Sequence, residues 1–259
     1  MGSVIGVTCC FALDNEIPAR EQCSLLAGYS DAIYRAGGIP LALPVPEEST
    51  PELIVQLLDR CDGLLLIGGP DIDPSRYGCP AHPRTVVMHP RRERFDFEIC
   101  RAADNRRMPM FGICGGHQMI HVVRGGCLIQ HIDDMHRDIP IKHSGVQAEN
   151  VFHNVRVEPD SHLASILGAT TLEASSRHHQ AVDPQHIGRG LRTVASADDG
   201  VIEASEDCDG RFLMSVQWHP EDLLDRTAHM NLFMALVDAS SKEFARHMPP
   251  KRQAPGEIN

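Results

Sequence analysis

Short apolar runs alternate with longer amphipathic segments along the first half of the chain. The apolar runs that we interpret as buried strands are 3–9, 39–45, 62–69 and 109–114. The segments with apolar residues at helical spacing predict helices over 24–36, from 51 onward, over 91–107 and over 116–124. Strands and helices in this alternation predict an α/β fold: a mainly parallel central sheet flanked by helices on both faces.

The second half has a different pattern. Alternating apolar and polar residues predict additional antiparallel, partly exposed strands at 150–158, 191–197, 200–206 and 211–219. Apolar residues at helical spacing then predict a last helix over 226–246. Because no internal repeat or long linker interrupts the chain, we predict a single domain over residues 1–247. The polar, proline-containing tail 248–259 is expected to be disordered.

Composition limits the partners that the protein could have. The chain has 259 residues with 42% hydrophobic content, enough for a sizeable core, and 24 basic against 35 acidic residues give a net charge of −11. Such a charge disfavours nucleic acid and anionic membrane surfaces. The basic group in 91–95 is interleaved with Glu93 and followed by Asp96, so we interpret it as a solvated helix face.

Cysteine usage and the first residues indicate a reducing compartment. The chain has nine cysteines, an odd number, and no C-x-x-C pair. Reduced thiols in the cytoplasm are therefore expected. The N-terminal segment lacks a basic region before its apolar run, so we expect neither a signal peptide nor a membrane anchor.

One cysteine lies in a local pattern with chemical meaning. The run from Gly112 through Ile113, Cys114 and Gly115 to Gly116 has the form G-x-nucleophile-x-G, between a predicted strand and a predicted helix. This is the pattern of a nucleophile elbow, here with a thiol in place of a serine hydroxyl. The dipole of the following helix favours the thiolate, and free N–H groups in its first turn can bind an oxyanion. We therefore predict Cys114 as a nucleophile rather than a core residue.

A nucleophilic thiol needs a base, and the end of a later apolar strand offers one. His219 and Glu221 are two residues apart, so both side chains can lie on one side of the backbone, and Pro220 stiffens the segment between them. A carboxylate that accepts from one imidazole nitrogen orients the other nitrogen toward its target. A Cys-His-Glu triad is the resulting prediction.

Taken together, these motifs resemble the class I glutamine amidotransferase-like superfamily. The closest likeness is to its γ-glutamyl-γ-aminobutyrate hydrolase type, peptidase family C26. The resemblance covers nearly the whole chain and implies a flavodoxin-like, class I glutamine amidotransferase-like fold. The motifs that carry it, in the family's order, are LLLIGGPDIDPSRYG (64–78), FGICGGHQ (111–118), SSRHHQAV (175–182), DDGVIEASE (198–206) and VQWHPE (216–221).

The resemblance also implies roles for individual residues. It makes Cys114 the nucleophile, His219 the general base and acid, and Glu221 the group that orients His219. It places the oxyanion hole at the backbone N–H groups of Gly69 and Gly115. The side chains that it implies near the γ-glutamyl group are Gln118, His178, His179 and Gln180. Related hydrolases often carry arginine directly after the nucleophile, where this chain has Gly115.

Neither a metal nor an organic cofactor is expected. Four of the fifteen histidines, at 131, 136, 143 and 153, surround a polar loop, but their spacing matches no zinc motif. We interpret them as solvated loop histidines. Asp71 and Asp73 lie among prolines and glycines, which favours a structural role in turns over acid–base chemistry.

Three functions follow from these residues. The first is a γ-glutamyl hydrolase that cleaves a small γ-glutamyl amide through a thioester, such as γ-glutamyl-γ-aminobutyrate or a γ-glutamyl polyamine. The second is a glutaminase that supplies ammonia to a partner synthetase, although the extra loops at 70–90 and 131–150 resemble the hydrolase branch. The third is a non-catalytic redox sensor that uses Cys114, for which an oriented base would be unnecessary. The expected partner is a small γ-glutamyl substrate. Among the possible assemblies we name a homodimer, because dimers are the commonest homo-oligomers.

Overall fold

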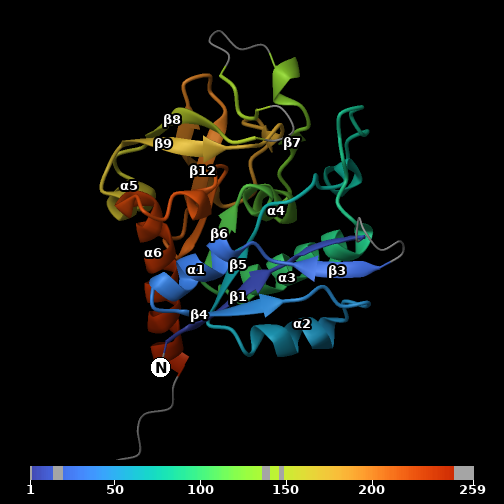
Figure 1. Cartoon of the computed structure of the whole chain (residues 1–259), viewed down its shortest axis with the longest axis vertical. Helices are drawn as coiled ribbons and strands as arrows, with labels where there is room; N and C mark the ends of the chain where they lie inside the picture. Colours follow the sequence, from blue (N-terminus) through green and yellow to red (C-terminus); the bar gives the residue numbers. More distant parts are fainter. Residues whose placement is uncertain (1, 14–19, 136–140, 146–148, 248–259) are drawn as a thin grey trace, which may run out of the picture.

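A nine-stranded mixed sheet organises the described part of the chain. The computed structural model describes residues 2–13, 20–135, 141–145 and 149–247 (Figure 1). The parallel strands, in spatial order, are β4 (Ile39–Leu43), β1 (Val4–Thr8), β5 (Gly63–Leu66), β6 (Met110–Ile113) and β13 (Leu213–Val216). The antiparallel strands that continue the sheet are β12 (Ile202–Asp207), β11 (Leu191–Ala197), β8 (Val151–Val157) and β9 (Thr171–Ser176). The predicted α/β class and mainly parallel centre are therefore confirmed.

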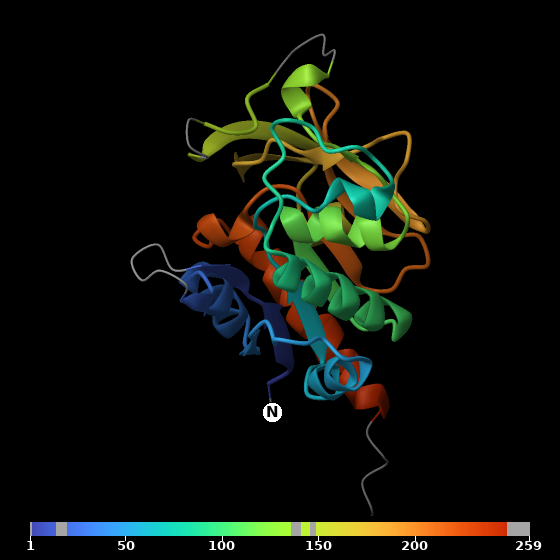
Figure 2. The same ribbon diagram turned by 90° about the vertical axis from the view of Figure 1, so that its right-hand side faces the viewer.

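Helices cover the sheet on two sides, as Figures 1 and 2 show. One buried cluster packs the sheet against α1 (Ala27–Arg35), α5 (His162–Leu167) and α6 (Thr227–His247). A second cluster packs the other side against α2 (Pro51–Leu58), α3 (Pro90–Asn105) and α4 (Gly115–Val123). The central strands are apolar on both faces because each face lies against one of these two clusters.

Local sequence signals explain where several of these helices begin. The Thr50 hydroxyl accepts a hydrogen bond from the Leu53 N–H at 3.2 Å, and Pro51 occupies the first turn of α2. Ser161 caps α5 in the same way, with its hydroxyl accepting from the Ala164 N–H at 2.9 Å. These caps satisfy N–H groups that would otherwise lack partners at the helix start.

Smaller elements complete the described fold. β2 (Cys10–Leu13) pairs antiparallel with β3 (Glu21–Ser24), and β7 (Leu128–Ile129) pairs with β10 (Ala181–Val182). The short 3₁₀ turns used below are η1 (Pro74–Tyr77), η2 (Ile132–Asp134) and η4 (Pro220–Asp222). The sequence patterns did not predict the β2–β3 pair, α5 or β9.

The prediction of partly exposed strands in the second half is correct only in part. β8 alternates buried and more exposed positions, as expected for a strand with one covered face. In contrast, β12 and β13 are buried along their whole length. Their burial follows from their place in the sheet, because β13 pairs with β6 on one side and with β12 on the other.

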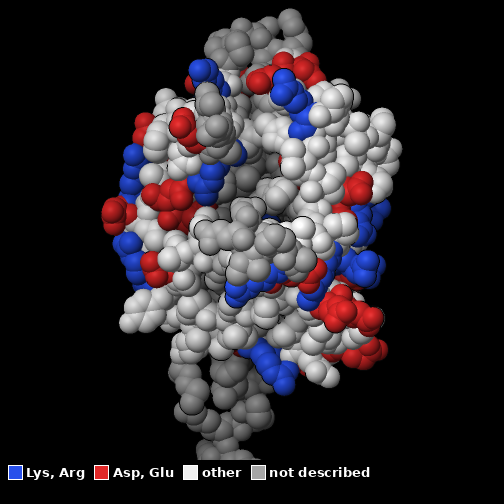
Figure 3. Space-filling model, turned by 45° about the vertical axis from the view of Figure 1, so that its right-hand side comes forward, with Lys and Arg blue, Asp and Glu red and all other residues white. Residues whose placement is uncertain are grey.

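The surface carries charge of both signs. Figure 3 shows acidic and basic side chains interspersed among uncharged ones on the face that it draws.

In the described ranges, none of the helices combines the length and apolar character needed to cross a bilayer. All nine cysteines are free of disulfide bonds. The predicted tail 248–259 lies outside the described residues.

Candidate active site

Cys114 lies at the sharp turn between β6 and α4. Its φ of 52° is in the left-handed region that non-glycine residues rarely adopt. The turn is held because the Cys114 N–H donates to the Val216 carbonyl at 2.8 Å. Glycine is needed on both sides, since a Cβ at Gly112 would lie 2.7 Å from the Gly116 carbonyl oxygen and one at Gly116 would overlap the Leu66 carbonyl. The structure therefore has the strained strand–turn–helix geometry that the elbow pattern predicts.

His219 and Glu221 form a buried pair at the end of β13. The imidazole Nδ1 lies 2.6 Å from Glu221 Oε1, and the His219 N–H donates to the Ser175 carbonyl at 2.8 Å. Burial by itself lowers the pKa of His219, but Glu221 and then Cys114 outweigh it and raise that pKa to about 10. The structure thus favours a protonated imidazole between a carboxylate and a thiol.

Cys114 and His219 approach each other across Gly68. A Cβ built on Gly68 would lie 3.3 Å from both the Cys114 Cβ and the His219 Cε1. His219 Nε2, the nitrogen opposite Glu221, has no hydrogen-bond partner of acceptable geometry among the described residues. β6 and β13 bring the two side chains together because they are adjacent parallel strands that end at the same edge of the sheet.

The two predicted oxyanion donors also lie close to this thiol. A Cβ on Gly115 would be 3.3 Å from the Gly69 backbone nitrogen. Within the described ranges, neither the Gly69 N–H nor the Gly115 N–H donates a hydrogen bond to another protein group. Two unused donors beside a nucleophile are the arrangement that stabilises a tetrahedral oxyanion.

Arg92 supports the loop that carries Gly69. Its guanidinium donates from Nη2 to the Gly68 carbonyl at 2.7 Å and from Nε to Asp96 at 3.0 Å. The interpretation of 91–95 as a solvated helix face is therefore wrong for Arg92, which is 1% exposed, and for the buried Glu93 and Asp96. The i,i+4 spacing of Arg92 and Asp96 is visible in the sequence, but burial of this face follows only from the packing of α3 on the sheet.

Two further residues that the sequence analysis missed surround Glu221. Arg177 Nη2 donates to Glu221 Oε1 at 3.1 Å, and Arg177 also pairs with Asp222. The buried Tyr29 of α1 lies beside the same carboxylate, and burial and then Glu221 raise the pKa of its hydroxyl. A guanidinium and a hydroxyl therefore hold the Glu221 carboxylate in position next to His219.

The four residues predicted to approach a substrate occupy different environments. Gln118 is buried and donates from Nε2 to the Gln180 carbonyl and to Gln217 Oε1, both at 3.2 Å. Gln180 and His178 are also buried, whereas the half-buried His179 pairs through Nε2 with Asp71 at 3.0 Å. The contact of these residues with substrate stays a prediction.

The acidic residues near Pro70 have the structural contacts expected of turn residues. Asp71 accepts from the Val86 N–H at 2.7 Å, and Asp73 accepts from the Ser75 N–H at 2.9 Å at the start of η1. Hydrogen bonds from Ser75 lower the pKa of Asp73. Neither carboxylate is among the partners of the Cys114 and His219 side chains.

The expectation of solvated loop histidines is wrong for two of the four. His143 and His153 are buried, while His131 is partly exposed and stacks on His82 with ring centroids 5.4 Å apart. His136 lies outside the described residues. Spacing along the chain could not indicate burial here, because the segments that enclose His143 and His153 come from later strands.

Comparison with known proteins identifies the family of the chain. The family model for peptidase C26 matches residues 3–221, a span that includes Cys114, His219 and Glu221. The chain belongs to the peptidase C26 family.

Two relatives and one solved structure show what the chain is similar to. A Mycobacterium tuberculosis protein provisionally named a glutamine amidotransferase is 41% identical over 87% of this chain and 70% of its own length. The γ-glutamyl-γ-aminobutyrate hydrolase PuuD of Escherichia coli is 32% identical over 84% of this chain and 85% of its own length. A solved glutaminase domain of Trypanosoma brucei CTPS shares the fold, with a TM-score of 0.64 and 18% identity over 93% of this chain and 94% of that one. The family and the fold of a class I glutamine amidotransferase domain are therefore established.

Proposed function

We propose that the protein is a cysteine-dependent γ-glutamyl hydrolase that cleaves the amide bond of a small γ-glutamyl compound. The observation that carries the proposal is the convergence of a thiol on a strained elbow, an imidazole–carboxylate pair and two unused N–H donors. The named hydrolase among the 32% identical relatives supports the choice of substrate class. The candidate amines are γ-aminobutyrate and polyamines.

In the proposed reaction, Cys114 as the thiolate, with its proton already on His219, attacks the γ-carbonyl carbon of the substrate. The tetrahedral oxyanion accepts hydrogen bonds from the N–H groups of Gly69 and Gly115. His219 donates its proton to the amine as the C–N bond breaks, which leaves a γ-glutamyl thioester on Cys114. A water that gives its proton to His219 then hydrolyses the thioester and releases glutamate.

Glu221 acts through His219 in this scheme. Its carboxylate holds the imidazole at Nδ1 and raises the imidazole pKa, so the proton needed by the leaving amine is retained. A sensor thiol would need a nearby positive charge but no oriented acid–base group. The paired His219 and Glu221 therefore favour hydrolysis over a purely redox role for Cys114.

A second candidate is a glutaminase that delivers ammonia to a partner synthetase. Its support is the relative at 41% identity whose provisional name is glutamine amidotransferase. The two candidates share the thioester chemistry and differ in the leaving group and in the need for a partner. Both are therefore tested by one substrate panel.

The test is release of glutamate by the purified full chain from γ-glutamyl amides, glutamine included. Cys114→Ala should reduce turnover to the uncatalysed rate, whereas Cys100→Ala, a buried cysteine of α3 away from the elbow, should retain it. Amine-capped substrates hydrolysed by the chain alone support the hydrolase. Activity confined to glutamine would favour the glutaminase instead. Full activity of Cys114→Ala on a confirmed substrate would contradict both.

A further inference from the structure

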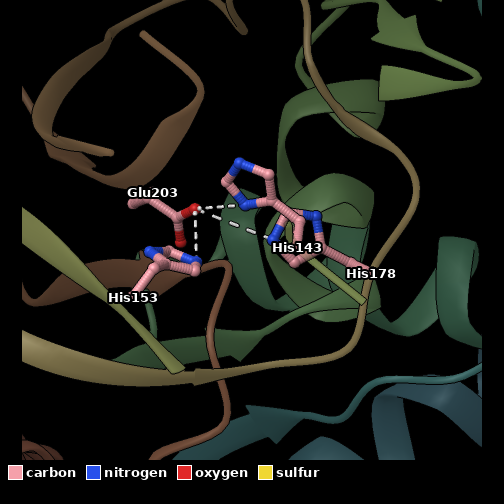
Figure 4. A group of neighbouring side chains, drawn as sticks. All are labelled: His143, His153, His178 and Glu203. Carbon is pink, nitrogen blue, oxygen red and sulfur yellow. Dashed lines mark ion pairs between the residues drawn. The ribbon is translucent and has the colours of Figure 1, made fainter. Parts of the chain in front are cut away.

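Four side chains with metal-binding groups converge outside the candidate active site. They come from four segments: His143 from the 141–145 loop, His153 from β8, His178 from the segment after β9 and Glu203 from β12 (Figure 4). They are 5%, 7%, 5% and 0% exposed. Burial of three imidazoles around one carboxylate is costly unless their polar atoms are matched.

The atoms that face one another form ion-pair contacts but no hydrogen bonds of acceptable geometry. Glu203 Oε1 lies 3.2 Å from His143 Nδ1, 3.6 Å from His153 Nε2 and 3.7 Å from His178 Nε2. Among the described residues, none of these three nitrogens and neither Glu203 oxygen has a hydrogen-bond partner of acceptable geometry. Figure 4 shows the three rings directed at the same carboxylate. The cluster therefore directs several buried ligand atoms that lack hydrogen bonds at one point.

The other ring nitrogens face hydrogen-bond acceptors. His143 Nε2 is 3.0 Å from Asp199 Oδ2, His178 Nδ1 is 2.8 Å from the Gln180 carbonyl, and His153 Nδ1 is 3.3 Å from the Asn154 carbonyl. A neutral imidazole that donates from one nitrogen has a lone pair on the other. The nitrogens that face Glu203 are therefore the ones that carry lone pairs in the neutral rings. Outer carboxylate or carbonyl acceptors of this kind are typical of metal-bound histidines.

Charge balance favours a cation at this point. Three neutral rings would direct lone pairs at a carboxylate, and three protonated rings would place a surplus of positive charge in a buried space. One protonated ring would pair with Glu203 but leave the lone pairs of the other two rings directed at the same carboxylate. A divalent cation would instead be balanced by the carboxylates of Glu203 and Asp199. In addition, a tetrahedral ion with bonds of about 2.0–2.1 Å separates its ligand atoms by roughly 3.4 Å. The three distances to Glu203 Oε1, 3.2–3.7 Å, bracket that separation.

We propose that His143, His153, His178 and Glu203 form a closed, four-coordinate site for a divalent transition metal, with Zn²⁺ as the ion that fits it. Imidazole and carboxylate ligands in a tetrahedral set suit Zn²⁺, whereas Mg²⁺ and Ca²⁺ select oxygen ligands. A cavity of about 240 Å³ lined by His143, His178 and the polar Lys142 and Ser144 gives an ion a route to the site.

The metal in this site is structural. Four protein ligands leave no open position for substrate. The ligand segments are already tied to one another, since the His178 N–H donates to the His143 carbonyl at 2.9 Å and β8, which carries His153, pairs with β9. A bound ion would lock the 141–145 loop and the segment after β9 onto the antiparallel half of the sheet.

Metal content is the first test. Purified full chain, desalted after exposure to ZnCl₂, is expected to contain about one zinc per chain by inductively coupled plasma mass spectrometry. His143→Asn, His178→Gln and Glu203→Gln each remove one ligand with little change of shape and should lower zinc at least tenfold. His229→Gln, at a buried histidine outside the cluster, should retain it. Equal zinc in the ligand variants and the wild type would overturn the proposal.

The second test measures the thermal stability of the wild type alone, so its result does not depend on whether the variants fold. Binding at a thousandfold excess over Kd corresponds to a rise in Tm of roughly 8–16 °C for a protein of this size class. Treatment of the wild type with 1,10-phenanthroline should lower Tm by several degrees, and added ZnCl₂ should restore it. A wild type that neither retains zinc nor changes Tm with it would refute the site. Because neither measurement uses turnover, the result does not depend on the proposed hydrolase activity.

Discussion

The substitution Gly69→Ala tests the proposed oxyanion hole, because the Arg92 side chain packs directly against Gly69. A Cβ at position 69 would overlap Arg92 Nη1 and lie 2.8 Å from Arg92 Cζ and 2.9 Å from Nη2. The guanidinium cannot move aside without losing its bonds to the Gly68 carbonyl and to Asp96, both inside the protein. The loop is therefore expected to shift, and the Gly69 N–H to leave its place beside Cys114.

The expected effects on activity and on stability can be separated. Removal of one oxyanion donor lowers kcat by about 10²–10³, which corresponds to about 2.7–4 kcal/mol of transition-state stabilisation. Overpacking by one methyl group in a tight site costs about 1–3 kcal/mol of folding free energy. The protein should therefore remain folded at room temperature while it loses most of its activity.

The assay is steady-state glutamate release, with thermal denaturation measured on the same samples. Gly115→Ala is the matched control, because its Cβ would lie 3.3 Å from the Gly69 nitrogen, a tight contact but not an overlap. We expect Gly115→Ala to keep kcat within about tenfold of wild type, well above Gly69→Ala. If Gly69→Ala retains more than about a third of wild-type kcat with a correct fold, Gly69 is not a donor to the oxyanion.

Two further substitutions test the groups around the thiol. Glu221→Gln removes the carboxylate that raises the pKa of His219 to about 10 and leaves the burial that lowers it, so the high-pH decline of kcat/KM should move to lower pH. A pH profile that is unchanged in the variant would show that Glu221 does not set this pKa. Arg92→Lys cannot bond both Asp96 and the Gly68 carbonyl, so it should lower the free energy of unfolding by about 1–3 kcal/mol and lower kcat more than it changes KM. Equal kcat in this variant and the wild type would mean that Arg92 has no part in positioning the loop.

Local patterns in the sequence predict the parts of the site that lie close together in the chain. The elbow around Cys114 can be predicted from the sequence because its tight turn and close backbone contacts require glycine at positions 112 and 116. The pairing of His219 with Glu221 is readable because the two residues are two positions apart. The approach of Cys114 to His219 depends instead on the pairing of β6 with β13; the sequence indicated it only through the chemical need of a thiol for a base and through the family resemblance.

Features that depend on burial were not predictable from local spacing. Arg92 occupies a charged, helical stretch that resembles a solvated surface, yet it is covered by the loop that it supports. The histidine cluster was not predictable for the same reason. His143 and His153 are near each other in the chain, but His178 and Glu203 join them only because the sheet places β8, β9 and β12 in one region.

The order of strands links the two sites of the protein. Glu203 of β12 accepts a backbone hydrogen bond from Gln217, which lies two residues before His219. The Gln118 side chain, in the helix that follows Cys114, donates both to Gln217 and to the Gln180 carbonyl. That same carbonyl accepts from His178 of the cluster. Gln118 and Gln180 therefore lie between the histidine cluster and the thiol, where their hydrogen bonds connect the antiparallel half of the sheet to the elbow.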